Sequence, residues 1–95
     1  MQVTGKVVVV TGGGNGIGKA LCEAFHQAGA ARVVVADIDP AAARAVATPI
    51  SGAAFKCDVG KETDILHVIE ETEHQFGPIA LFCSNAGIGG GFDPM

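Results

Sequence analysis

The chain of 95 residues carries a formal net charge of −4, and 48% of its residues are hydrophobic against 17% charged. This composition is typical of a soluble globular domain and excludes an intrinsically disordered chain. The six basic residues form no patch along the sequence, which argues against partners such as nucleic acid or an anionic membrane surface. No apolar run approaches the roughly 20 residues of a membrane span, and no signal-peptide pattern is present, so we expect a cytoplasmic protein.

The cysteines and histidines predict no metal site. Cys22, Cys57 and Cys83 are odd in number and lack C-x-x-C spacing, so we interpret them as small buried thiols. The histidines also have no partner at ligand spacing, and we expect them on helix surfaces or at helix ends. They are His26, His67 and His74.

The first strand is predicted over Lys6–Val10, where four consecutive valines suit a strand covered on both faces of a parallel sheet. A glycine-rich turn over Thr11–Asn15 then leads into a helix over Ile17–Ala28. Apolar residues recur along this helix at helical spacing and predict the stripe that packs on the sheet. These residues are Ile17, Leu21, Ala24, Phe25 and Ala28.

Strands and helices continue to alternate to the end of the chain. Asp39 and Pro40 are typical of a helix N-cap and first helical position, and Gly77-Pro78 is typical of a helix end. The predicted ranges are Arg32–Ala36 (strand), Ala41–Thr48 (helix), Ala53–Cys57 (strand), Lys61–Phe76 (helix) and Ile79–Ser84 (strand). The apolar face of the last helix is expected to hold Ile65, Leu66, Ile69, Thr72 and Phe76.

This βαβαβαβ order predicts an α/β fold, a Rossmann-type doubly wound parallel sheet with right-handed crossovers and strand order 3-2-1-4. Ligands of such sheets bind outside the carboxyl ends of the strands, where the strand order reverses. Four stretches lie at those ends and should line one crevice. They are Thr11–Gly18, Asp37, Asp58 and Asn85–Gly87.

The fourth predicted strand indicates that the chain is part of a larger domain. Its Ile79–Cys83 segment is apolar without alternation, which is typical of a central strand with a neighbour on each side. No further strand follows it here, and a bare apolar edge would be prone to aggregation. We therefore interpret residues 1–95 as the N-terminal part of a single larger Rossmann domain, apparently truncated.

The glycine-rich turn fits the pattern T-G-x-x-x-G-x-G through Thr11, Gly12, Gly16 and Gly18. In order, its glycines permit a tight turn, close approach of backbone N–H groups to an anion, and close packing of helix on strand. A helix N-terminus also carries about half a positive charge, which favours a diphosphate. An acidic residue about 20 positions later, Asp37, is the expected acceptor for a ribose 2′-hydroxyl, although taken alone it also fits a turn residue.

Charge in the same region favours NAD over NADP. Asp37 would repel a 2′-phosphate, and neither Asn15 nor Ile38 supplies a cation to hold one. A competing pattern, G-x-x-x-x-G-K over Gly13–Lys19, is that of a triphosphate-binding loop, but Ala20 stands where a Mg²⁺-binding hydroxyl is needed. Two further alternatives stay open, since Asp58 could cap the third helix and Asn85–Gly87 could be a plain loop.

Taken together, four motifs resemble the short-chain dehydrogenase/reductase family over the whole chain. They are Thr11–Gly18, Asp37, Cys57-Asp58-Val59 and Ser84-Asn85-Ala86-Gly87. The resemblance implies a Rossmann domain that binds NAD or NADP, and an oxidoreductase that interconverts an alcohol and a carbonyl by hydride transfer, usually as a homo-oligomer. One departure is Ser84, because the family commonly has Asn there.

The resemblance also implies which residues bind the cofactor. Gly12, Gly16, Ile17 and Gly18 would hold the diphosphate, with Gly14 and Asn15 completing the turn; Asp37 and Ile38 would contact the adenosine ribose, Asp58 and Val59 the adenine, and Asn85, Ala86 and Gly87 the nicotinamide-side ribose. No catalytic residue is expected, because the family's catalytic Ser and Tyr-x-x-x-Lys lie beyond this region and the chain has no tyrosine. The alternative is a non-catalytic NAD-binding module or truncated isoform.

Overall fold

The computed structural model describes residues 3–14 and 16–85, in which strands and helices alternate. The four strands pair in parallel in the order β3-β2-β1-β4, which confirms the predicted doubly wound topology. The bounds are β1 Val7–Thr11, α1 Gly16–Gln27, β2 Arg32–Asp37, α2 Pro40–Ala47, a 3₁₀ turn η1 Thr48–Ile50, β3 Ala53–Lys56, α3 Glu62–Phe76 and β4 Ile79–Ser84.

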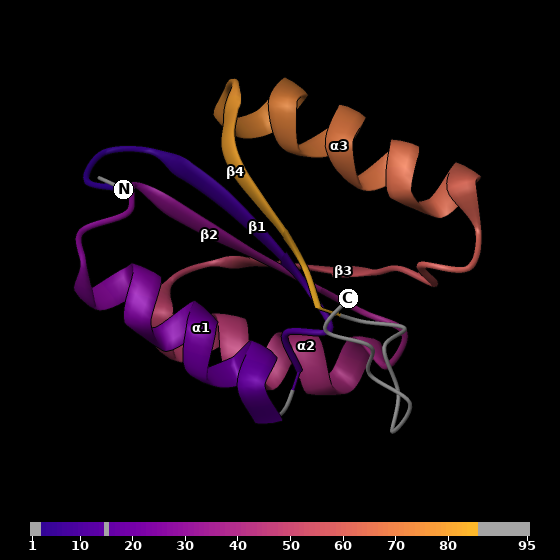
Figure 1. Cartoon of the computed structure of the whole chain (residues 1–95), viewed down its shortest axis with the longest axis horizontal. Coiled ribbons are helices and arrows are strands. Elements are labelled where there is room, and N and C mark those ends of the chain that lie inside the picture. The colour runs from indigo at the N-terminus through magenta and orange to yellow at the C-terminus, as the bar shows by residue number, and fades with distance from the viewer. Residues whose placement is uncertain (1–2, 15, 86–95) are drawn as a thin grey trace, which may run out of the picture.

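The sheet is the middle of three layers. Helices α1 and α2 cover one face and α3 covers the other (Figure 1). Since side chains alternate along a strand, β1 sends Val8 and Val10 into the core beneath α1 and α2, and Val9 into the core beneath α3. All of β1 is buried, as the run of valines predicted. Strand β4 pairs with β1 but is only partly buried.

Helix α1 packs through only part of the predicted stripe, because Leu21 and Phe25 are partly buried against the core and the other predicted members are exposed. The prediction placed Ile17 and Ala28 on the packed face, but Ile17 is 72% exposed and Ala28 is exposed as well. The fully buried residues of α1 are Gly18 and Cys22, which the prediction did not place on this face. A helix can approach the sheet most closely where it has no side chain, so Gly18 sets the contact face and turns Ile17 outward.

Helix α3 shows a smaller error of the same kind. Leu66 was expected on the packed face and is 49% exposed, whereas the α3 residues that are fully buried are Val68 and Thr72. Residues 65, 68, 69, 72 and 76 follow the i, i+3, i+4, i+7 spacing of a single face, and position 66 lies off it.

The start of α2 agrees with its predicted capping. The Asp39 carboxylate accepts hydrogen bonds from the backbone N–H groups of Ala41 and Ala42, at 3.0 and 3.2 Å. The end differs slightly, because α2 passes at Thr48 into a 3₁₀ turn that contains Pro49. Within residues 3–14 and 16–85, no helix combines the length and apolar character needed to cross a membrane.

Candidate functional site

The glycine turn is held at the carboxyl edge of the sheet by the ends of both neighbouring strands. Thr11, the last residue of β1, is 1% exposed. Its hydroxyl donates to the Cys83 carbonyl at 3.3 Å and accepts from the Asn85 backbone N–H at 2.9 Å, which joins β1 to the end of β4. On the other side, the Gly13 N–H donates to the Ala36 carbonyl of β2 at 3.2 Å.

The three motif glycines occupy three different environments. Gly12 and Gly16 have φ angles of +67° and +59°, a region that side chains rarely adopt. A Cβ on Gly18 would collide with the Gly12 carbonyl oxygen, and would lie 2.9 Å from the Gly13 Cα. A Cβ on Gly16 would meet nothing within 4 Å. Gly18 is therefore required by packing, whereas Gly16 stands at the start of α1 beside open space.

Asp37 lies at the carboxyl end of β2 with both carboxylate oxygens engaged. Oδ2 accepts from the Gly14 backbone N–H at 3.0 Å, and Oδ1 accepts from the Asp39 backbone N–H at 2.9 Å. The second bond makes Asp37 the turn residue that its sequence context also suggested. A carboxylate offers about four lone-pair positions, so this structural role leaves room for a further donor.

Exposed apolar side chains flank this region. Ile17 is 72% exposed on the first turn of α1, and Ile38 is 60% exposed immediately after Asp37. Both are predicted cofactor contacts. Helix α1 also has no acidic residue in its first turn, so no carboxylate of its own competes for the positive end of the helix dipole. The edge can accommodate a group that is partly apolar and partly anionic.

Asp58 forms its own local turn and does not cap α3. Its carboxylate accepts from the Gly60 N–H at 2.9 Å, while Lys61 occupies the N-cap position without a side-chain cap hydrogen bond. The backbone N–H of Asp58 donates to Asp64 Oδ2 at 3.0 Å. Asp64 therefore anchors the loop that carries Asp58 and Val59, a role the sequence reading missed. The signal for it was an acidic residue in the first turn of a helix.

The structure places only part of the predicted nicotinamide end. The Asn85 side-chain amide donates to the Gly12 carbonyl at 3.4 Å, which brings the end of β4 against the glycine turn. Asn15, Ala86 and Gly87 lie outside the described residues. Lys19, the lysine of the competing triphosphate-loop pattern, is exposed on α1.

The thiols are unsuited to nucleophilic catalysis. Burial is the main cause that raises the pKa of Cys22 to about 11, with smaller contributions from Cys83 and Glu23, and burial also raises the pKa values of Cys57 and Cys83. The three histidines are exposed, as expected. Among the residues that the structure describes, no group of three or more His, Cys, Asp or Glu side chains could hold a metal ion.

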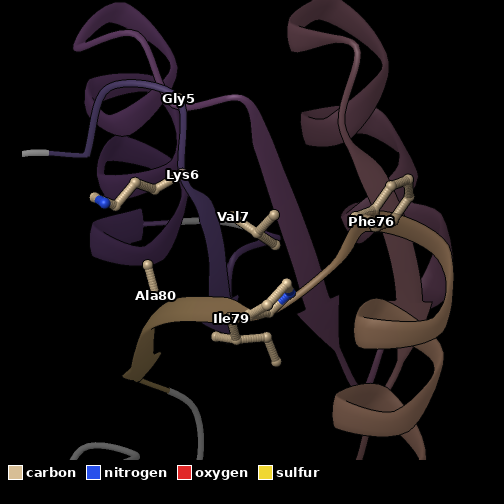
Figure 2. A pocket seen from close by; sticks show the side chains of 7 residues that line it. Gly5, Lys6, Val7, Phe76, Ile79 and Ala80 are labelled. Carbon is tan, nitrogen blue, oxygen red and sulfur yellow. The ribbon is translucent and has the colours of Figure 1, made fainter.

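A pocket of about 300 Å³ lies at the opposite, amino-terminal edge of the sheet. Figure 2 shows Val7 of β1 and Ile79 of β4 beside Phe76 at the end of α3, with Lys6 nearby. The Arg32 guanidinium stacks 4.8 Å from the centre of the Phe76 ring. None of the predicted cofactor residues that the structure describes lines this pocket.

Comparisons with known proteins agree with the geometry. A sequence model described as short chain dehydrogenase matches residues 6–95. Among curated proteins, the chain is 40% identical over 89 residues to tropinone reductase-like 1 of Erythroxylum coca, and 45% identical over 87 residues to L-fucose dehydrogenase of Bos taurus. These alignments cover 92% and 90% of this chain but only 32% of each relative, so the chain spans about a third of their length.

Solved structures show the same likeness. A hydroxysteroid dehydrogenase from Escherichia coli superposes with a TM-score of 0.80 at 34% identity, over 90% of this chain and 38% of that one. A protein from Brucella melitensis 16M described as ribose-5-phosphate isomerase superposes with a TM-score of 0.84 at 35% identity, over 90% of this chain and 33% of that one. The family match covers nearly the whole sequence, and the chain belongs to the short-chain dehydrogenase family.

Proposed function

We propose that this chain is the cofactor-binding part of an NAD-dependent oxidoreductase that interconverts an alcohol and a carbonyl. The observation that carries the proposal is the Asp37 carboxylate, held by the Gly14 N–H at the tip of β2 beside a glycine turn that leaves open space at Gly16. Family membership supports a nicotinamide cofactor. The acidic residue at the ribose position supports NAD rather than NADP.

The chain's own residues would bind and orient the cofactor in this proposal. Backbone N–H groups at the start of α1 receive the diphosphate, and the glycine at position 16 leaves room for it. Asp37 accepts a hydrogen bond from the adenosine ribose, while Ile17 and Ile38 cover apolar parts of the ligand. When bound, the cofactor supplies the hydride chemistry, and the protein supplies position and electrostatics.

The preference for NAD follows from charge. A 2′-phosphate placed where the ribose hydroxyl donates would bring a second anion next to the Asp37 carboxylate. Like charges at hydrogen-bond distance are mutually destabilising, whereas a hydroxyl donates to the same oxygen. Because of this repulsion, we expect NAD⁺ to bind at least about tenfold more tightly than NADP⁺, a difference of about 1.4 kcal/mol in binding free energy.

Calorimetric titration with both dinucleotides tests the proposal. Asp37→Ala should weaken NAD⁺ binding and reduce the preference over NADP⁺. Asp39→Asn is the matched control, because it removes a carboxylate two residues away while keeping a side chain that caps α2. Tighter binding of NADP⁺ by the unaltered chain, or undiminished NAD⁺ binding by Asp37→Ala, would contradict the role of Asp37.

The substrate and the assembly belong to the whole protein. We propose a small-molecule alcohol or carbonyl as substrate, because the curated relatives are named as a reductase and a dehydrogenase. A cytoplasmic homo-oligomer is proposed from the sequence pattern and the family resemblance alone. The chain contains no tyrosine, so a phenol that exchanges a proton with the substrate oxygen has to come from sequence outside it. A transcript that continues past Met95 to Tyr-x-x-x-Lys would support the enzyme, and a stop codon there would support a non-catalytic NAD-binding module.

A further inference from the structure

Gly14 is the one member of the glycine-rich turn that bonds directly to Asp37 among the contacts of the described residues. Its backbone N–H donates to Asp37 Oδ2 at 3.0 Å across 23 positions of sequence. The other oxygen, Oδ1, is held by the Asp39 N–H at 2.9 Å. Two fixed backbone donors on opposite oxygens define the plane of the carboxylate, and one of those donors comes from the turn itself.

This contact exists only because residue 14 has no side chain. A Cβ at Gly14 would lie 2.8 Å from Asp37 Oδ2 and 2.8 Å from the Ala42 Cβ, closer than Cβ atoms approach other heavy atoms. Ala42 cannot easily yield, since its N–H is bonded to the Asp39 side chain that caps α2. Gly14 therefore fits between two anchored groups.

We propose that Gly14 is a positioning residue for cofactor selectivity, and that its N–H fixes the Asp37 carboxylate so that it cannot turn away from a 2′-phosphate. An aspartate free to change its χ1 rotamer would swing aside and relieve most of the repulsion. An aspartate bonded to Gly14 has to give up a charge-assisted hydrogen bond to do so. This inference rests on the proposed role of Asp37 in NAD binding.

The first experiment needs no cofactor. The ¹H–¹⁵N resonance of Gly14 is followed by NMR while the pH is lowered through the range in which carboxyl groups protonate. An N–H bonded to a carboxylate shifts when that carboxylate is protonated, so the Gly14 amide should titrate in the unaltered chain and in Asp39→Asn. It should not titrate in Asp37→Asn. If the pH dependence of the Gly14 resonance is the same in Asp37→Asn as in the unaltered chain, the proposal is overturned.

The second experiment measures selectivity in two variants. Gly14→Ala pushes Asp37 from its place, and we expect the ratio of NAD⁺ to NADP⁺ affinity to fall about tenfold, which corresponds to 1.4 kcal/mol. Adding Ala42→Gly removes the contact with the Ala42 Cβ and leaves the one with Asp37. Because Ala42→Gly alone weakens helix α2, where glycine is a poorer helix former than alanine, the double variant should be more stable than the sum of the two single changes predicts, while its selectivity remains low.

The outcomes separate positioning from simple packing. Selectivity that is unchanged in Gly14→Ala, or that returns together with stability in the double variant, would show that Gly14 only fills space and would overturn the proposal. If the unaltered chain binds neither dinucleotide, the proposed function fails and the selectivity role fails with it. The amide titration still decides separately whether Gly14 holds Asp37, including the case in which Gly14→Ala does not fold.

Discussion

The glycine turn at the carboxyl edge of the sheet differs from two glycines, Gly5 and Gly77, at the amino-terminal edge. At the amino-terminal edge, Gly5 and Gly77 have φ angles of +72° and +103°, and a Cβ on either would meet nothing within 4 Å. At the carboxyl edge, a Cβ on Gly13 would lie 2.8 Å from Val35 Cγ1, and one on Gly18 would collide with backbone. Gly5 and Gly77 provide only a backbone conformation, whereas the glycine turn combines positive φ angles, at Gly12 and Gly16, with close approach between segments, at Gly13 and Gly18.

The proposed cofactor site lies at the edge where three strands are tied together. The carboxyl edge ties β1, β2 and β4 together through Thr11, Gly13 and Asp37, whereas the amino-terminal edge leaves a solvent-open pocket. In a doubly wound sheet the carboxyl edge at the strand reversal is where ligands bind. Hydrogen bonds between the strand ends there fix the positions of the backbone N–H groups of Gly13 and Gly14.

The largest effect on stability should come from Gly18→Ala, compared with Gly5→Ala at the other edge of the sheet. Gly18→Ala places a Cβ against the Gly12 carbonyl, and we expect a loss of about 2–3 kcal/mol in the free energy of unfolding, even though alanine favours helix by about 1 kcal/mol. Gly5→Ala should cost only about 1 kcal/mol, since it meets left-handed backbone strain without a clash. Urea denaturation measures both, and equal losses would remove the distinction between the edges.

A second pair of variants compares threonines. Thr11→Val keeps the shape but removes a buried hydroxyl that bonds to Cys83 and Asn85, and we expect a loss of about 1–3 kcal/mol, because two partly buried backbone groups lose this hydrogen-bond partner. The control is Thr4→Val at the other edge, whose hydroxyl bonds to the Ala28 carbonyl in an exposed position. That change should stay within about 0.5 kcal/mol. A Thr11→Val chain as stable as Thr4→Val would contradict the interlocked edge.

The third comparison concerns the thiol beneath the glycine turn and appears only at alkaline pH. A Cβ on Gly13 would lie 3.0 Å from Cys22 Sγ, so this thiol packs directly under the turn, where burial raises its pKa from 9.0 to about 11. Between these values the unfolded chain loses the Cys22 proton while the folded chain keeps it. The free energy of unfolding should therefore fall as pH rises from 9.0 to about 11.

Cys22→Ala provides the control for that pH dependence. Urea midpoints compared at about pH 8 and about pH 10.5 should fall less in the variant than in the unaltered chain. The residual slope comes from Cys57 and Cys83, whose pKa values burial also raises. At neutral pH, iodoacetamide should modify the partly buried Cys83 before Cys22. An identical pH slope in both chains, or faster modification of Cys22, would mean that the turn does not shield this thiol.

Local patterns predicted most of the fold because they act over short stretches. The run of valines, the Asp39-Pro40 cap and the glycine turn each impose a backbone state through their own residues, and their elements appear within a residue or two of the predicted bounds. The predicted helix faces were less accurate at Ile17 and Leu66. Ile17 faces outward because Gly18 sets the close contact of α1 with the sheet, which only the packed fold shows. Leu66 lies off the spacing shared by residues 65, 68, 69, 72 and 76, so a stricter use of helical periodicity would have excluded it.

By itself, the sequence determined the alternation of strands and helices, their order in the sheet, and the identity of the glycine turn, since periodicity and chirality limit the topologies a chain can form. Only the tertiary structure decided that Gly14 bonds to Asp37 and that Asp64 holds the Asp58 loop. The first pair lies 23 positions apart and meets only once β1 and β2 are paired. Contacts of that kind depend on how closely two chain segments approach, a property of the packed fold that no local pattern contains.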